Sequence, residues 1–276
     1  MALTVAAALT EAHAAGLDRL DAQLLLSHVL ARPRPWLLAH DDVVLVLAQC
    51  EAYGSLLVRR LAGEPVAYLV GEKAFHELVL HVDASVLVPR PDTEVLVEWA
   101  IELLAGTTGM RVVDLGTGSG AIALAVKQAC PAAYVLAIDV SDAALAVART
   151  NAMRLRLDVA LTRSSWWHDL GSRRFDLVVS NPPYIAAGDP HLPALRHEPL
   201  QALMSGDDGL DALREIVAGT RDHLAPDAHI LLEHGHDQAD AVRALLAAQG
   251  LHVLGTRLDL GGRPRCTGAR AGPTSA

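Results

Sequence analysis

Short apolar runs alternate with longer amphipathic segments over the second half of the chain, and this alternation constrains the fold more than any other feature. The alternation predicts right-handed βαβ units and a mainly parallel, doubly wound α/β sheet. Strands are predicted near 111–115, 133–138, 158–162, 175–180, 228–233, 251–257 and 263–267, with helices near 119–129, 142–153, 209–224 and 237–249. Only Asp259 to Gly262 separate the last two strands, too few residues for a crossover, so these strands are expected to be antiparallel.

The first of these strands runs into a glycine-rich turn, Gly116-Thr117-Gly118-Ser119-Gly120, which is followed by a helix. Glycines permit positive φ angles and the close approach of a ligand, and the N–H groups at a helix start favour polar or anionic groups. The next strand ends near Asp139, where a carboxylate can accept hydrogen bonds from ribose hydroxyls. These features fit a site for a nicotinamide dinucleotide as well as a site for another nucleotide-like cofactor. Alone they do not decide between the two kinds of cofactor.

A second motif, Asn181-Pro182-Pro183-Tyr184, directly follows the buried strand at 175–180. The prolines cannot continue a strand, because they lack a backbone donor and their φ is fixed. Ligands bind outside the carboxyl ends of strands in open α/β sheets, so a stiff turn with a polar Asn and a planar Tyr indicates a recognition clamp there. A dehydrogenase has no need of such a clamp.

Together, DLGTGSG and NPPY resemble the S-adenosylmethionine-dependent methyltransferases that modify a planar amino group, either in nucleic acid or in a glutamine amide. Within that group the chain is similar to the release factor glutamine methyltransferases. The similarity extends from Gly71 to Arg265 and includes FHELVLHVDASVLVPRPDTEVLVEWA, NPPYIAAGDPHL, HEPLQAL and LLEHG in the family's order. The resemblance implies a seven-stranded, Rossmann-like class I methyltransferase sheet with an antiparallel last strand.

The resemblance also implies roles for individual residues. Gly116, Thr117, Gly118, Ser119 and Gly120 would surround the methionine part of S-adenosylmethionine, and Asp139 would bind its ribose. The oxygen of Asn181 and the carbonyl of Pro182 would accept the two N–H groups of the target glutamine amide. Tyr184 would stack on that amide, with Pro183 completing the substrate site, and Asn181 would also border the cofactor. Adenine or cytosine of nucleic acid is the alternative substrate, and a non-catalytic cofactor-binding module is a third reading.

Two adjacent tryptophans, Trp166 and Trp167, follow the third strand of the series. Only one of an adjacent pair can readily face inwards, and we expect Trp166 to flank the adenine, a stacking contact of about 1 kcal/mol. Ser165 stands where relatives commonly carry Asp, which predicts a weaker hydrogen bond to the adenine amino group. His81 stands where relatives often carry an aromatic residue of the substrate pocket.

The first part of the chain, residues 1–75, is expected to be a small helical bundle with helices near 3–15, 18–31 and 42–61. A protein-docking role is expected for it, and a stabilising cap is the alternative. Asp18 and Asp41 or Asp42 are the expected caps. Short alternating runs between Pro65 and Val88, Val66 to Val70 and Leu78 to Val82, are expected to form a β-hairpin or two linking strands. Residues 76–92 are assigned to this β-hairpin linker. The methyltransferase domain would cover 93–276, and Asp92 with Glu94 would cap its first helix, which reaches Ala105. Arg90, just before that cap, fits a surface ion pair as well as a functional role.

Charge and composition restrict the choice of partner. A net charge of −9 and near-balanced charge in the first 80 residues argue against a nucleic-acid-binding surface and favour release factors as the partner. Three widely spaced cysteines and the lack of a ~20-residue apolar span predict a cytoplasmic protein without membrane contact. The His-rich stretch 233–236 supplies too few converging ligands, so no metal is expected.

Overall fold

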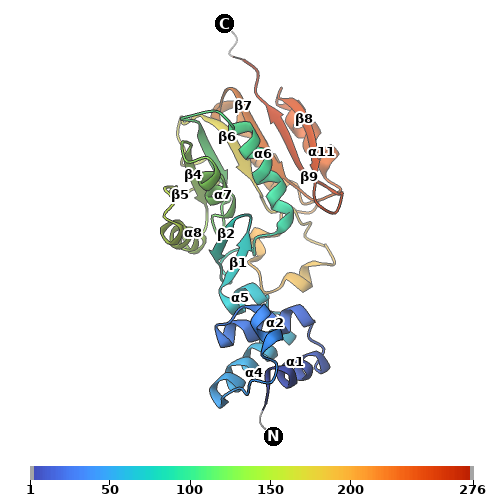
Figure 1. The fold of residues 1–276 in the computed structure, drawn as a ribbon. Helices are drawn as coiled ribbons and strands as arrows, with labels where there is room; N and C mark the ends of the chain where they lie inside the picture. Colours follow the sequence, from blue (N-terminus) through green and yellow to red (C-terminus); the bar gives the residue numbers. More distant parts are fainter. Residues whose placement is uncertain (1–2, 274–276) are drawn as a thin grey trace. The chain divides into compact units, whose positions relative to one another are not determined.

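A computed structural model describes residues 3–273 of the chain (Figure 1). The chain divides into two compact units, Met1–Glu72 and Lys73–Ala276. Among residues 3–273, no helix combines the length and the apolar character needed to cross a membrane.

In the described residues 3–71, the first unit is built from helices, with one isolated antiparallel β-bridge between Thr4 and Val44. Thr4 caps the first helix and Asp18 the second, each through a side-chain oxygen that accepts a backbone N–H. Leu25, Leu26 and Tyr53 are fully or almost fully buried in its core, where the Tyr53 hydroxyl donates to the carbonyl of Ala22 at 3.1 Å. The helices are α1 Val5–Ala14, α2 Arg19–Leu30, α3 Arg34–Ala39, α4 Leu47–Leu61 and α5 Val66–Val70.

Two expectations for this part of the chain were wrong, and one short helix was missed. The expected helix at 42–61 begins only at Leu47, after Val46, so neither Asp41 nor Asp42 caps it. The short helix Arg34–Ala39 was missed because one and a half turns starting at a proline pair carry little periodicity. Val66–Val70 is a helix rather than a strand: Pro65 precedes it, and Gly71 ends it with a left-handed φ of 74°.

A two-stranded hairpin of β1 Glu72–Phe75 and β2 Leu78–His81 starts at the last residue of the first unit and belongs otherwise to the second. The chain then passes through a 3₁₀ turn, η1 Pro91–Thr93, into α6 Glu94–Leu104. Asp92 and Glu94 do not cap α6, because its N-cap is Thr93 and no side chain bonds there. Asp92 instead pairs with Arg265 at 3.2 Å.

The seven-stranded sheet has the order β5-β4-β3-β6-β7-β9-β8. Five neighbouring strands from β5 to β7 are parallel, and β9 is antiparallel to both β7 and β8. The predicted α/β sheet with antiparallel final strands is confirmed. The strands are β3 Arg111–Leu115, β4 Tyr134–Asp139, β5 Ala160–Arg163, β6 Phe175–Ser180, β7 Leu224–Glu233, β8 His252–Leu258 and β9 Pro264–Arg270.

Helices pack against both faces of this sheet. One face carries α9 and α11, whose residues Leu213, Ile216, Val242 and Leu246 share a buried cluster with strand residues. The helix α6 contacts β6, β7 and β9, and α7 contacts β3 and β4 (Figure 1). The helices after α6 are α7 Ala121–Ala129, α8 Asp142–Leu155, α9 Asp211–Ala218, α10 Thr220–His223 and α11 Ala239–Ala248.

The expected helix at 209–224 is two helices, α9 and α10, which meet at Gly219. The Trp167 indole packs against this glycine so closely that a Cβ atom there would lie 2.1 Å from Trp167 Cδ1. The same indole donates to the carbonyl of Ile216 at 2.9 Å. The Trp167 indole therefore fills the space that a side chain at position 219 would need.

Candidate functional site

The glycine-rich turn connects β3 to α7 at the carboxyl edge of the sheet. Its first glycine, Gly116, has φ +75°, and the N–H groups of Gly116 and Thr117 donate to the carbonyl of Ile138 in β4. Gly120 starts α7 with φ +84°, and a Cβ there would lie 3.3 Å from that of Ala148. The chain therefore needs glycine at both ends of the turn, at one end for its curvature and at the other for helix packing.

Asp139, the last residue of β4, joins the turn to the start of α8. Its Oδ2 accepts the N–H of Gly118 at 2.9 Å, and its Oδ1 accepts the N–H of Ser141 at 2.9 Å. Burial raises the pKa of this carboxyl, while those backbone donors lower it. The two bonds fix a carboxylate at the edge of the cavity described below.

Beneath the turn lies Asp114, an acid for which the sequence indicates no role. It is fully buried, and its Oδ2 accepts from the Thr117 hydroxyl at 2.6 Å and from the N–H of Ala123 at 3.2 Å. Its Oδ1 has no partner among the described residues. Burial raises the pKa of Asp114 to about 7 against those two hydrogen bonds. Through these two hydrogen bonds, Asp114 connects the glycine-rich turn to the N-terminal end of α7.

The two tryptophans face different surroundings. Trp167 is in the core, where its ring stacks on His223 with centroids 4.7 Å apart. Trp166, held at φ +48°, lines the cavity and packs over the backbone of Gly116. Ser165 also lines the cavity.

Asn181 and Pro183 of the second motif border the cavity, whereas Pro182 is buried and Tyr184 lies behind it, against the core. The Asn181 amide nitrogen donates to the hydroxyl of Thr93 at 3.2 Å. The Tyr184 hydroxyl donates to Glu233 Oε1 at 3.4 Å, and burial raises the pKa of this tyrosine. Both ends of the motif are thus fixed by side chains from distant segments.

A second group of missed residues connects the segment before η1 to the 3₁₀ turn η3 Leu200–Ala202. Glu198 is buried, accepts the N–H of Val88 at 3.0 Å, and forms an ion pair with Arg90. Arg90 therefore has a buried structural partner. Pro89, which precedes Arg90, and Gln201 of η3 both line the cavity.

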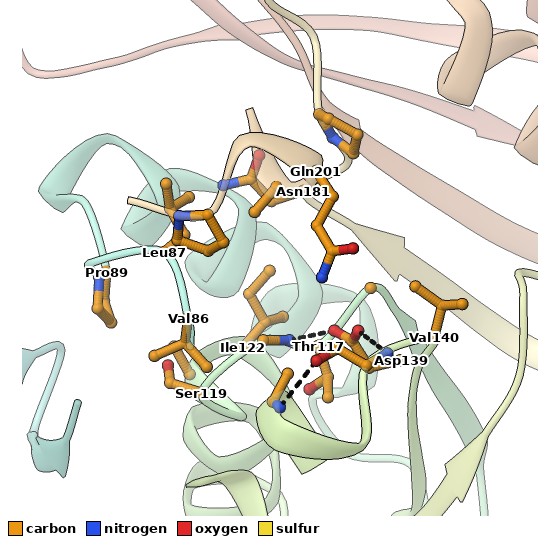
Figure 2. Close-up of a pocket in the computed structure, with 18 of the residues that line it drawn as sticks. Val86, Leu87, Pro89, Thr117, Ser119, Ile122, Asp139, Val140, Asn181 and Gln201 are labelled. Atoms are coloured by element: carbon orange, nitrogen blue, oxygen red, sulfur yellow. Dashed lines mark hydrogen bonds between the residues drawn. The ribbon is translucent and has the colours of Figure 1, made fainter. Parts of the chain in front are cut away.

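These elements enclose a cavity of about 180 Å³. Figure 2 shows Val86, Leu87 and Pro89 along one wall, with Asn181 and Gln201 across the cavity from Thr117 and Asp139. Phe75 supplies an aromatic wall, and His81 is not among the lining residues. Gly116, Thr117, Gly118, Ser119, Asp139, Trp166, Asn181 and Pro183 line it, whereas Gly120, Pro182 and Tyr184 do not.

The His-rich stretch after β7 does not form a metal cluster. The ring of His234 is fully buried, with Nδ1 at 2.8 Å from the carbonyl of Gly235 and Nε2 at 2.8 Å from the Thr267 hydroxyl. Burial lowers the pKa of His234 and so favours the neutral ring. In the part of the chain that the structure describes, no three His, Cys, Asp or Glu side chains converge as metal ligands.

Two family models match the chain: "Methyltransferase small domain" over residues 92–198 and "PrmC N-terminal domain" over residues 2–71. The chain is 50% identical to the release factor glutamine methyltransferase of Bordetella pertussis, over 92% of this chain and 95% of that protein. It is 40% identical to the release factor glutamine methyltransferase of Escherichia coli, over 94% and 95% of the two chains.

Solved structures resemble the fold at lower identity. The ribosomal protein L11 methylase of Lactobacillus delbrueckii has a TM-score of 0.53 and 24% identity, over 70% of this chain and 85% of that one. The Thermus thermophilus 16S rRNA N2 G1207 methyltransferase, in complex with AdoMet and guanosine, has a TM-score of 0.55 and 20% identity, over 72% and 49%. The match is confined to the class I methyltransferase fold.

Proposed function

The chain belongs to the release factor glutamine methyltransferases, and from this premise we propose that it methylates the side-chain amide nitrogen of a glutamine in a peptide chain release factor. The methyl donor is S-adenosylmethionine, in keeping with the methyltransferase domain. The observation that carries the proposal is the convergence of Asn181 and Asp139 on one cavity at the carboxyl edge of the sheet.

The chemistry of the residues that line the cavity supports the cofactor assignment. We assign the methionine part to Gly116, Thr117, Gly118, Ser119 and Gly120, the ribose to Asp139 and the adenine to Trp166. A side chain at Gly116 would press on the Trp166 ring, so glycine allows this indole to lie against the turn. The carboxylate of Asp139 offers the acceptors that ribose hydroxyls need. When bound, S-adenosylmethionine supplies a methyl group on a sulfonium, an electrophile that needs no metal.

An amide nitrogen is a poor nucleophile, because its lone pair is delocalised into the carbonyl. The clamp, Asn181 to Tyr184, would compensate for this by orienting the nitrogen. We assign the two acceptors for the glutamine N–H groups to the Asn181 side-chain oxygen and the Pro182 carbonyl. These bonds would aim the lone pair at the methyl group and stabilise the positive charge that develops on nitrogen. Tyr184 would bound the flat face of the amide, with Pro183 beside it. The product loses a proton to water, so no general base is required.

The protein substrate is supported by charge. The net charge of −9 is unfavourable for binding a phosphate backbone. A glutamine on an exposed loop also enters a narrow pocket without the unpairing that a base in a duplex requires. We assign residues 1–75 a docking role toward the release factor, in line with the N-terminal family model over 2–71.

The test incubates the protein with labelled S-adenosylmethionine and either a release factor or DNA. We expect label in the release factor only. Asn181→Ala should bind S-adenosylmethionine normally but lower kcat far more than it changes KM, because the lost bond aligns the nitrogen in the transition state. Gln249→Ala, which removes an exposed amide outside the cavity, is the matched control. Labelled DNA with unlabelled release factor would overturn the substrate and support the nucleic-acid alternative.

A further inference from the structure

Two polar groups of the clamp converge on one buried carboxyl behind the cavity. The Asn181 amide nitrogen donates to the Thr93 hydroxyl, which in turn hydrogen bonds to Glu233. The Tyr184 hydroxyl donates to the same carboxyl. Thr93 is 4% exposed and Glu233 is 1% exposed, so water does not compete for these bonds.

The direction of the hydrogen bonds from Asn181 through Thr93 to Glu233 determines which end of the Asn181 amide faces the cavity. A hydroxyl has one hydrogen, and an ionised carboxylate only accepts hydrogen bonds. Thr93 therefore gives its hydrogen to Glu233 and accepts the N–H of Asn181 on its oxygen. The Asn181 oxygen is left as the free end of the amide, the acceptor that a substrate N–H group requires.

A donor at position 233 would reverse this order. Thr93 would accept a hydrogen from residue 233 and give its own to the oxygen of Asn181. The amide would then turn its nitrogen toward the cavity, where two N–H groups would face each other. Building on the proposed function, we propose that Thr93 and Glu233 are positioning residues that keep the Asn181 oxygen directed at the substrate amide.

Charged or titratable groups from three segments act on the Glu233 carboxyl. They are Asp92 of η1, Tyr184 after β6, and Arg265 and Cys266 of β9. Burial raises the pKa of Glu233 to about 7, opposed by the Thr93 hydrogen bond and the Arg265 charge. Its Oε2 has no partner among residues 3–273. Protonation near neutral pH would supply the donor that reverses the chain of hydrogen bonds.

The first experiment compares two substitutions of Thr93 in the full-length enzyme with a release factor substrate. Thr93→Val should lower kcat about 10- to 100-fold, the effect of one misdirected hydrogen bond in the transition state. The KM for release factor and the Kd for S-adenosylmethionine should remain within about twofold, because Thr93→Val changes alignment rather than binding. Thr93→Ser should restore most of kcat.

Thr220→Val is the matched control for this comparison. It removes an equally buried hydroxyl that donates to the carbonyl of Val217, away from the cavity. Its kcat should equal that of the wild type. Wild-type kcat in Thr93→Val would overturn the inference, and so would an equal loss in Thr93→Val and Thr93→Ser.

The second experiment uses Glu233→Gln and the pH profile. The wild-type kcat should rise with pH through about 7, whereas Glu233→Gln should be slow and lack this rise. If Glu233→Gln fails to fold, the comparison of Thr93→Val with Thr93→Ser decides. A Glu233→Gln enzyme that keeps the wild-type profile would contradict the role of Glu233.

A nuclear magnetic resonance titration separates this inference from the proposed function. The side-chain amide signal of Asn181, identified by its loss in Asn181→Ala, should shift with pH near 7 in the cofactor-bound wild type and not in Thr93→Val. A wild type that fails to methylate release factor but shows this shift would refute the substrate and keep the positioning role. An Asn181 signal insensitive to pH would refute the positioning role.

Discussion

The Trp166 indole lies over the backbone of Gly116 so closely that a Cβ at position 116 would be 3.3 Å from Cζ3 of the ring. Gly116→Ala should therefore displace the ring and strain a backbone at φ +75°. We expect a stability loss of about 1 kcal/mol from the strain, and about tenfold weaker S-adenosylmethionine binding, equivalent to one lost contact of ordinary strength.

Gly171→Ala is the control for strain alone. Gly171 has φ +57°, and its added Cβ would meet nothing within 4 Å. In thermal unfolding, Gly171→Ala should lose as much stability as Gly116→Ala. In calorimetry, it should bind S-adenosylmethionine with the affinity of the wild type. Equal affinities of the Gly116→Ala enzyme and the wild type would show that Trp166 does not flank the cofactor.

Replacing Asp139 with Ala should weaken S-adenosylmethionine binding about 10- to 100-fold, because one or two charge-assisted hydrogen bonds are lost. Calorimetry measures this change, and Asp142→Ala is the matched control. Asp142 lies three residues on, and its side chain is 76% exposed and 3.6 Å from Arg163. Unchanged affinity in Asp139→Ala, or tight binding of NAD by the wild type, would favour a dehydrogenase-type cofactor instead.

Ser165→Asp should tighten S-adenosylmethionine binding about three- to tenfold, the effect of one added hydrogen bond. Ser165 lines the cavity and is exposed, so the new carboxylate can accept from the adenine amino group without a large desolvation cost. Ser165→Val, which adds bulk without an acceptor, should not tighten binding. Direct titration of both variants measures the difference, and weaker binding in Ser165→Asp would place the adenine elsewhere.

The buried Asp114 carboxyl should make stability depend on pH. Its pKa is about 7 in the folded protein against an ordinary value of 3.8, so its contribution is fully present below about 3.8 and lost as pH rises through about 7. Asp114→Asn should flatten the decline in unfolding free energy between pH 5 and 7, by at most about 1.4 kcal/mol per pH unit.

Denaturant unfolding at several pH values measures this slope. Asp208→Asn is the control, since hydrogen bonding to Arg214 lowers the pKa of Asp208 and removes its titration from this window. A slope in Asp114→Asn identical to that of the wild type would mean that burial does not raise the pKa of Asp114 in the folded protein.

The sheet was predictable because inner strands such as β3 and β6 are largely apolar and lead into glycine- or proline-rich turns. Both β3 and β6 have their predicted bounds, Arg111–Leu115 and Phe175–Ser180. The residues that line the cavity after these strands were predictable for the same reason, since parallel strands bring their carboxyl ends to one edge.

The residues that support the clamp were not predictable in this way. Thr93 and Asn181 are 88 residues apart in sequence, and Val88 and Glu198 are 110 apart. No local periodicity indicates such pairs, because loops rather than strands bring them together. Glu233 and Asp114 are single acids within apolar strands, and the sequence pattern does not mark such residues as functional. Their burial, seen only in the structure, shows that they require hydrogen-bond partners.

The strand β9 is synthesised after β8, yet it lies between β7 and β8. During translation β8 has no neighbour to pair with until β9 emerges and inserts beside β7. Because β9 carries Arg265 and Cys266 next to Glu233, the surroundings of that carboxyl are assembled only in this last step. A growing chain would thus complete its glycine-rich turn early but would acquire a working clamp only after its final strand has docked.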